Sequence, residues 1–167
     1  LNGVAPVIVT RDGVSTTPQV VELAEYAPGV FTYARNATTL DPVIVHADNR
    51  LVTPDDPASA NDILVIYATG VGSFDNPPGT GLAAPAAPLA RAKVLPTVSV
   101  GSASAGVSFA GLTPGFVGLL QINIQLPNSC PTGNSLPLAV QFPGGSSPIV
   151  NLNVGNANLG ILLSDFL

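Results

Sequence analysis

Residues 111–127 constrain the fold more than any other stretch of this sequence. From Leu120 to Leu126, apolar residues alternate strictly with Gln and Asn. Successive side chains of a strand point to opposite faces, so the alternation predicts a half-buried β-strand. Pro127 should end it, because proline cannot donate to a sheet ladder, and Pro114-Gly115 marks a turn before it. The stretch therefore predicts an antiparallel β-domain with one buried face and one solvated face.

The composition supports a β-rich globular chain with many turns. The 167 residues are 46% hydrophobic, and the mean hydropathy of +0.45 excludes a disordered tail. Gly and Pro each number 17, which favours turns over long helices. Only 9% of residues are charged and the net charge is −5. Because phosphate backbones are bound by Lys and Arg, of which there are five, we expect no nucleic-acid partner.

Membrane insertion, disulfide formation and a retained signal peptide are not expected. No apolar run approaches the roughly 18 residues that indicate a membrane-spanning helix. Cys130 is the only cysteine, so it is either a buried small residue or the partner of another chain. The chain has no Met, even at position 1, which indicates processing or trimming.

Two segments carry hairpin patterns. Residues 6–10 and 19–23 are rich in β-branched residues and flank Arg11-Asp12-Gly13, a strong hairpin turn signal. Residues 136–142 and 150–154 form a second such pair around a Pro- and Gly-rich loop. Between them, the apolar run of residues 63–68 predicts a central strand covered on both faces.

The two hairpins resemble each other and indicate an internal repeat. Pro6-Val7-Ile8-Val9 matches Pro137-Leu138-Ala139-Val140, and Gly13 matches Gly145. Pro18 then matches Pro148, and residues 20–23 match residues 150–153. The first hairpin therefore resembles the last two strands of a sandwich domain. We expect a partial domain at 1–26, a complete one at 27–154 and an apolar tail at 155–167. Residues 1–26 could pack on the following domain, be completed by another chain, or be a truncation remnant.

Several phrases resemble a known family, the repeated C-terminal module of large secreted proteins of Solibacter and related Acidobacteria. The resemblance runs from about residue 4 to residue 154. It implies an immunoglobulin-like (IPT/TIG-like) antiparallel sandwich with an additional N-terminal hairpin from a second sandwich, and secretion; it implies no known activity. The phrases that carry it are residues 6–15, 27–32, 61–72 (Asn-Asp-Ile-Leu-Val-Ile-Tyr-Ala-Thr-Gly-Val-Gly) and 110–123.

Catalytic and metal-binding patterns are sparse. His46 is the only histidine, and no Gly-x-Ser-x-Gly motif accompanies it, so a Ser–His–acid triad is disfavoured. One His and one Cys do not supply a zinc site. Calcium is less excluded because hard cations prefer oxygen ligands, although no EF-hand spacing is present. The weak calcium candidates are Asp48, Asp55, Asp56 and Asp62. No cofactor is expected.

The sequence thus favours a non-enzymatic extracellular or cell-surface module. We expect it to pair with copies of itself or with adjoining modules of the same secreted protein, as in a filament, through strand edges at its ends. The expected assembly residues are Val7, Ile8, Val9, Val20, Val21, Leu23, Ile161, Leu162, Leu163 and Phe166.

An adhesive or carbohydrate-binding module, presenting loops within 70–90, is the alternative. The low aromatic content of 5% argues against sugar stacking. Asn36-Ala37-Thr38 fits the N-glycosylation pattern, which makes Asn36 a modification candidate.

Overall fold

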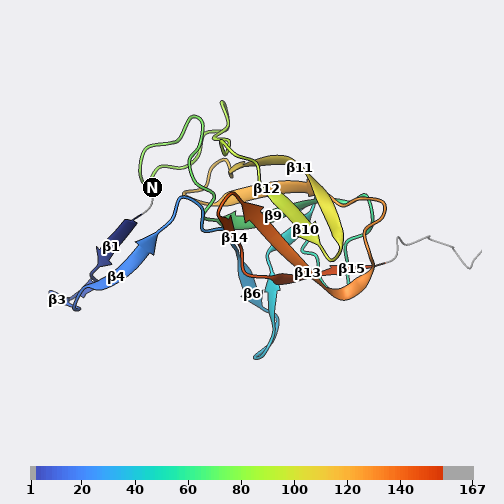
Figure 1. Cartoon of the computed structure of the whole chain (residues 1–167), viewed down its shortest axis with the longest axis horizontal. Coiled ribbons are helices and arrows are strands. Elements are labelled where there is room, and N and C mark those ends of the chain that lie inside the picture. The colour runs from blue at the N-terminus through green and yellow to red at the C-terminus, as the bar shows by residue number, and fades with distance from the viewer. Residues whose placement is uncertain (1–2, 156–167) are drawn as a thin grey trace, which may run out of the picture.

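The computed structural model describes residues 3–155, and these form fifteen β-strands and no helix. All pairings between strands are antiparallel, so the predicted all-β antiparallel fold is confirmed. Figure 1 shows a body built around one large sheet, from which an N-terminal hairpin projects. The expected tail lies almost wholly outside the described residues.

Nine strands form the main sheet of the body. They are β5 (Gly29–Val30), β8 (Ile44–His46), β9 (Ile63–Thr69), β10 (Thr97–Val100), β11 (Ala103–Leu112), β12 (Leu120–Gln125), β13 (Gly133–Phe142), β14 (Gly145–Ser146) and β15 (Val150–Val154). Seven follow the order β14-β13-β10-β11-β12-β9-β5, while β15 pairs with β13 and β8 pairs with β9. The sheet curls strongly into a half-barrel, and the pairing does not show the two facing sheets of an immunoglobulin-like sandwich.

Strand β12 forms as its sequence predicts. Its burial alternates, with Leu120, Ile122 and Ile124 at most 1% exposed and the Gln and Asn residues between them half-buried. It pairs with β11 on one side and β9 on the other, so Ile122 lies opposite Ala110 and Ile66. The alternating stretch is therefore the centre of the sheet.

Strand β9 is central, as predicted, but only one of its faces is fully covered. Leu64 and Ile66 are completely buried, whereas Val65 and Tyr67 are half-buried and Ile63 is exposed. The continuous apolar run predicted cover on both faces. On the other face, Tyr67 lines a hollow together with Phe31 and Phe116 and stays partly exposed.

The core fills the concave side of the curled sheet. Its largest buried side chains come from β8, β9, β10, β12, β13 and β15 and from Leu126, which follows β12. Burying such side chains contributes about 1.5–3 kcal/mol each before conformational entropy is counted. They are Ile44, Leu64, Ile66, Val98, Val100, Leu120, Ile122, Ile124, Leu126, Leu138, Val140 and Leu152.

The N-terminal hairpin is confirmed and stands apart from the body (Figure 1). Strand β1 (Gly3–Val7) pairs with β4 (Gln19–Leu23), and β2 (Thr10–Arg11) pairs with β3 (Val14–Ser15). Asp12 and Gly13 have φ of 50° and 79°, the left-handed geometry that a tight hairpin turn requires. Residues 24–28 then join the hairpin to the body.

A shorter hairpin and one long connection complete the chain. Strand β6 (Thr32–Ala34) pairs with β7 (Leu40–Pro42) and projects below the body in Figure 1. Residues 73–92 contain no named strand and run as the predicted extended connection. Isolated bridges, such as the one between Arg91 and Gly111, hold this connection to the body.

Candidate functional site

The N-terminal hairpin presents the predicted assembly residues as an exposed apolar surface. Val7, Val9, Val21 and Leu23 are 45%, 61%, 40% and 38% exposed. Ile8 and Val20 are exposed as well. The structure places these six in one hairpin, where Val7, Val21 and Leu23 share one face of the β1–β4 pair, Val20 lies on the other face, and Ile8 and Val9 follow β1. Sequence analysis could not tell whether they pack on the body. The other expected assembly residues, Ile161, Leu162, Leu163 and Phe166, lie outside the described residues.

From the pair Ala5–Val21 to the turn, the N-terminal hairpin has the same strand register as the last hairpin of the body, at a spacing of 131 residues. This agreement confirms the predicted repeat of two hairpins. Near the start of β13 the register shifts, so that Gly133 and not Asn134 lies opposite Val154. The matching opposed pairs are Ala5–Val21 with Leu136–Leu152, Pro6–Val20 with Pro137–Asn151, Val7–Gln19 with Leu138–Val150, Thr10–Ser15 with Gln141–Ser146, and Arg11–Val14 with Phe142–Gly145.

The repeat extends to individual hydrogen bonds. The Val9 N–H donates to Thr16 Oγ1 at 3.2 Å, and the Val9 carbonyl accepts from the Thr16 N–H at 3.0 Å. In the body, the Val140 N–H donates to Ser147 Oγ at 3.0 Å and its carbonyl accepts from the Ser147 N–H at 2.8 Å. Both hairpins are therefore built by the same local interactions.

The observed register corrects the sequence match by one residue in its second half. Gly13 corresponds to Gly144 rather than to Gly145, and these two turn glycines have φ of 79° and 80°. Val21 corresponds to Leu152 rather than to Asn151. The sequence match followed the prolines after the turns, whereas strand register is set by backbone pairing and by which face is apolar.

The two hairpins differ in what covers them. Leu138 and Val140 are completely buried, and Leu152 and Val154 are 1% exposed. Their counterparts in the N-terminal hairpin are the four exposed residues Val7, Val9, Val21 and Leu23. The same face is thus core in one hairpin and open in the other, and a lone two-stranded hairpin is marginal in water.

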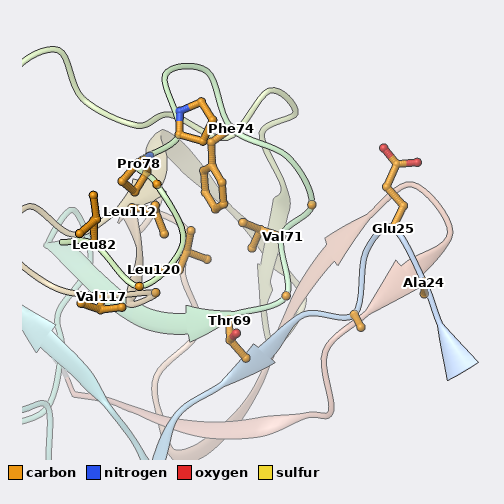
Figure 2. A pocket seen from close by; sticks show the side chains of 17 residues that line it. Ala24, Glu25, Thr69, Val71, Phe74, Pro78, Leu82, Leu112, Val117 and Leu120 are labelled. Atoms are coloured by element: carbon orange, nitrogen blue, oxygen red, sulfur yellow. The ribbon is translucent and has the colours of Figure 1, made fainter. Parts of the chain in front are cut away.

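A hollow of about 450 Å³ lies where the junction of residues 24–27 meets the body (Figure 2). Val71, Phe74, Leu112 and Leu120 line it, and Glu25 is its only ionisable lining residue. The hollow therefore offers no acid–base pair or metal ligand set. Gly70 also lines the hollow. Its φ is 77°, and a side chain at this position would collide with the Ala27 carbonyl oxygen.

His46 lies beside part of the acidic loop, in an arrangement held by ion pairs. It is buried, with Nε2 3.8 Å from the Asp56 carboxylate and Nδ1 3.7 Å from that of Asp62. Arg50 contacts Asp48 at 2.8 Å and also binds Asp56. His46 Nε2 also lies 3.3 Å from the Asp56 carbonyl oxygen, so both ring nitrogens face the acidic loop.

Of the calcium candidates, Asp48, Asp56 and Asp62 lie around Arg50 and His46, and Asp62 accepts a hydrogen bond from the Ser59 N–H at 2.8 Å. Asp55 is exposed, whereas Asp48 and Asp56 are tied to Arg50. The hydrogen bonds that Arg50 donates from its side chain and its backbone hold the pKa of Asp48 below its usual range. Within residues 3–155, no group of three or more His, Cys, Asp or Glu side chains is arranged to hold a metal.

Two further features of the surface bear on function. Asn36 is exposed at the tip of the β6–β7 hairpin, where its Oδ1 accepts hydrogen bonds from the Thr38 N–H at 3.0 Å and hydroxyl at 3.1 Å. This placement leaves the glycosylation pattern accessible. Phe31, Tyr67 and Phe116 surround a shallow apolar hollow of about 380 Å³. Sequence reasoning missed this cluster because its members are far apart in the chain.

Comparison of the chain with family models, with curated proteins and with solved structures gave no match. The resemblance to the Solibacter module therefore stays a prediction. Within the described residues, no helix is long and apolar enough to cross a membrane.

Proposed function

We propose that this chain is a non-enzymatic, extracellular structural module that joins others at the cell surface or in a filament by strand addition. The observation that carries the proposal is the N-terminal hairpin, whose apolar face is open although the same face of the matching hairpin is core. An immunoglobulin-like sandwich, completed by neighbouring modules, is the fold that this function would use. Copies of the chain or adjoining modules would be the partners.

Physical chemistry favours a partner for this hairpin. An exposed strand edge presents unpaired N–H and C=O groups that readily pair with another chain, and natural proteins usually block such edges. The edge of β1 carries valines and Pro6 and no charged residue. Pro6 has no N–H to donate, but its counterpart Pro137 accepts from the Gly101 N–H at 2.8 Å, so a proline at this position is compatible with strand pairing. Backbone hydrogen bonds along the edge would give affinity, and the alternating side chains would give fit.

The assembly state of the intact chain, measured by light scattering and electron microscopy, tests this proposal. The double substitution Val7→Lys and Val9→Lys places two charges on the apolar face and should abolish assembly. Val14→Lys at the hairpin tip is the matched control, because Val14 is 75% exposed and lies in the β2–β3 pair, outside β1 and β4. Assembly that persists in the double variant would contradict the proposal.

The aromatic hollow favours a second candidate, an adhesive or carbohydrate-binding module. Aromatic rings can stack on the apolar faces of sugars, and Phe116 is 56% exposed at the rim of the hollow. A glycan array probed with the intact chain and with Phe116→Ala tests it. Binding that is lost in the variant would support it, and an array without hits would remove it.

A further inference from the structure

We infer that the partner of the N-terminal hairpin is the body of a module with this same fold, open where its own last hairpin would lie. This inference rests on the proposed function and specifies its partner. It concerns the hairpin stem, residues 5–10 and 19–24. The spacing of 131 residues gives each stem residue a counterpart in the body's last hairpin, and the contacts of these counterparts define the partner.

The first transferred contact is a strand along the free edge of β1. In the body, this edge of β13 pairs with β10, so that Val140 lies opposite Val98 and Leu138 opposite Val100. The equivalent of Val140 in the stem is Val9. The partner therefore presents an antiparallel strand like β10 with its Val98 position opposite Val9.

The second transferred contact lies along the free edge of β4. In the body, the Ala58 N–H donates to the Asn153 carbonyl at 3.0 Å, and the Gly155 N–H donates to the Ala58 carbonyl at 2.8 Å. The stem residues in these places are Glu22 and Ala24. A partner of this fold would thus hold the stem from both edges, which a flat strand-to-strand dimer would not do.

The third transferred contact is the core itself. The four apolar residues of the stem match four that are at most 1% exposed in the body, and all eight are aliphatic. Exposed apolar patches of this kind commonly mark interaction surfaces, because burying them removes apolar area from water. An apolar sheet face like the one that covers the last hairpin of the body would bury these four side chains. The partner would cover Val7, Val9, Val21 and Leu23.

The hairpin tip, residues 11–14, limits how far the equivalence reaches. Phe142 stacks on Tyr26 with ring centroids 5.1 Å apart, and Arg11 stands in the place of Phe142. A Cβ on Gly145 would lie 2.6 Å from the Tyr26 carbonyl oxygen, and Val14 stands in its place. The partner therefore takes the stem but holds no segment like Tyr26 against the tip.

A fusion tests this inference with the full chain. Residues 27–132 are placed directly before Gly3, because Gly133 pairs with Val154 in the body as Gly3 pairs with Leu23 in the hairpin. This stretch omits Tyr26 and so leaves room for Val14. Amide hydrogen exchange at residues 7–10 and 19–23 is compared between the fusion and the chain alone. We expect exchange in the fusion to slow by about 100-fold or more, since core strands open far less often than exposed hairpins.

A second fusion is the matched control. It places residues 27–155 before Gly3, so the added body keeps its own last hairpin. The stem should then exchange as fast as in the chain alone. A stem that stays unprotected in the first fusion would overturn the inference, and so would equal protection in both fusions. Loss of assembly in the lysine variants together with an unprotected stem would leave the proposed function standing and remove only this partner.

Discussion

Val9 and Val140 allow one side chain to be compared in two environments. They occupy equivalent positions with equivalent backbone hydrogen bonds, but Val9 is 61% exposed and Val140 is completely buried. Changing each to alanine, one at a time, removes the same two methyl groups from the same local structure. Any difference in the free energy of unfolding therefore reports what covers the hairpin, and not how the hairpin itself is built.

The expected magnitudes follow from burial. Burying two methyl groups stabilises the folded state by about 1.6 kcal/mol. With the cavity that the truncation leaves, Val140→Ala should lower the free energy of unfolding by about 2–3 kcal/mol. Val9 keeps most of its surface in water, so Val9→Ala should cost about 0.5 kcal/mol or less.

Urea unfolding followed by circular dichroism measures both costs. With a slope of about 2 kcal/mol per molar urea, Val140→Ala should lower the midpoint by about 1 M or slightly more, and Val9→Ala by about 0.25 M or less. The chain is kept at concentrations where light scattering shows a monomer, so that assembly does not cover Val9. Equal shifts would refute the reasoning, because they would mean that the N-terminal hairpin is packed as tightly as the last hairpin of the body.

Three further outcomes are expected. Gly70→Ala should lower the free energy of unfolding by at least about 3 kcal/mol, because the added Cβ collides with backbone and the φ is left-handed. Gly115→Ala, with φ of 81° and open space around it, should cost only about 1 kcal/mol. Equal costs in urea unfolding would contradict this. Arg50→Gln should raise the pKa of Asp48 toward its usual value, as measured by NMR titration. In the native chain, the Asp48–Arg50 interaction stabilises the fold at pH values above the usual aspartate pKa, and this stabilisation is lost as the pH falls through the lowered pKa. Burial raises the pKa of the Cys130 thiol, so an aromatic disulfide reagent should label it slowly until urea unfolds the chain, and rapid labelling of the native chain would count against its burial.

Local features of this fold could be predicted from the sequence because their causes are local. The alternation from Leu120 to Leu126 determines a strand with one buried face, and Asp12-Gly13 determines a tight turn through its left-handed backbone. The repeat of the two hairpins was visible as well. Its register was not, because the prolines after the turns drew the match one residue away from the backbone pairing.

The remaining features depend on contacts between distant segments. The half-barrel curl arises from nine strands pairing in an order that skips along the chain, such as β9 beside β12. Whether Tyr67 is covered depends on residues that lie far from it in the sequence, such as Phe31 and Phe116. The aromatic hollow needs Phe31 and Phe116 to meet across the sheet. The assembly residues of the candidate site could be named from the sequence. Their exposure could not be predicted, because a covered hairpin and an open hairpin have the same alternating apolar pattern.

The differences between the two hairpins also restrict how copies could assemble. If the N-terminal hairpin of one copy displaced the last hairpin of another, Val14 would meet the Tyr26 carbonyl oxygen and Arg11 would replace the stacked ring of Phe142. Each change is unfavourable, since the first creates a backbone collision and the second removes the stacking of Tyr26 on buried Phe142. The body therefore keeps its own last hairpin, and exchange of the two hairpins between intact copies is disfavoured. Assembly would then have to proceed by addition to an open module or edge, which makes growth directional from one module to the next.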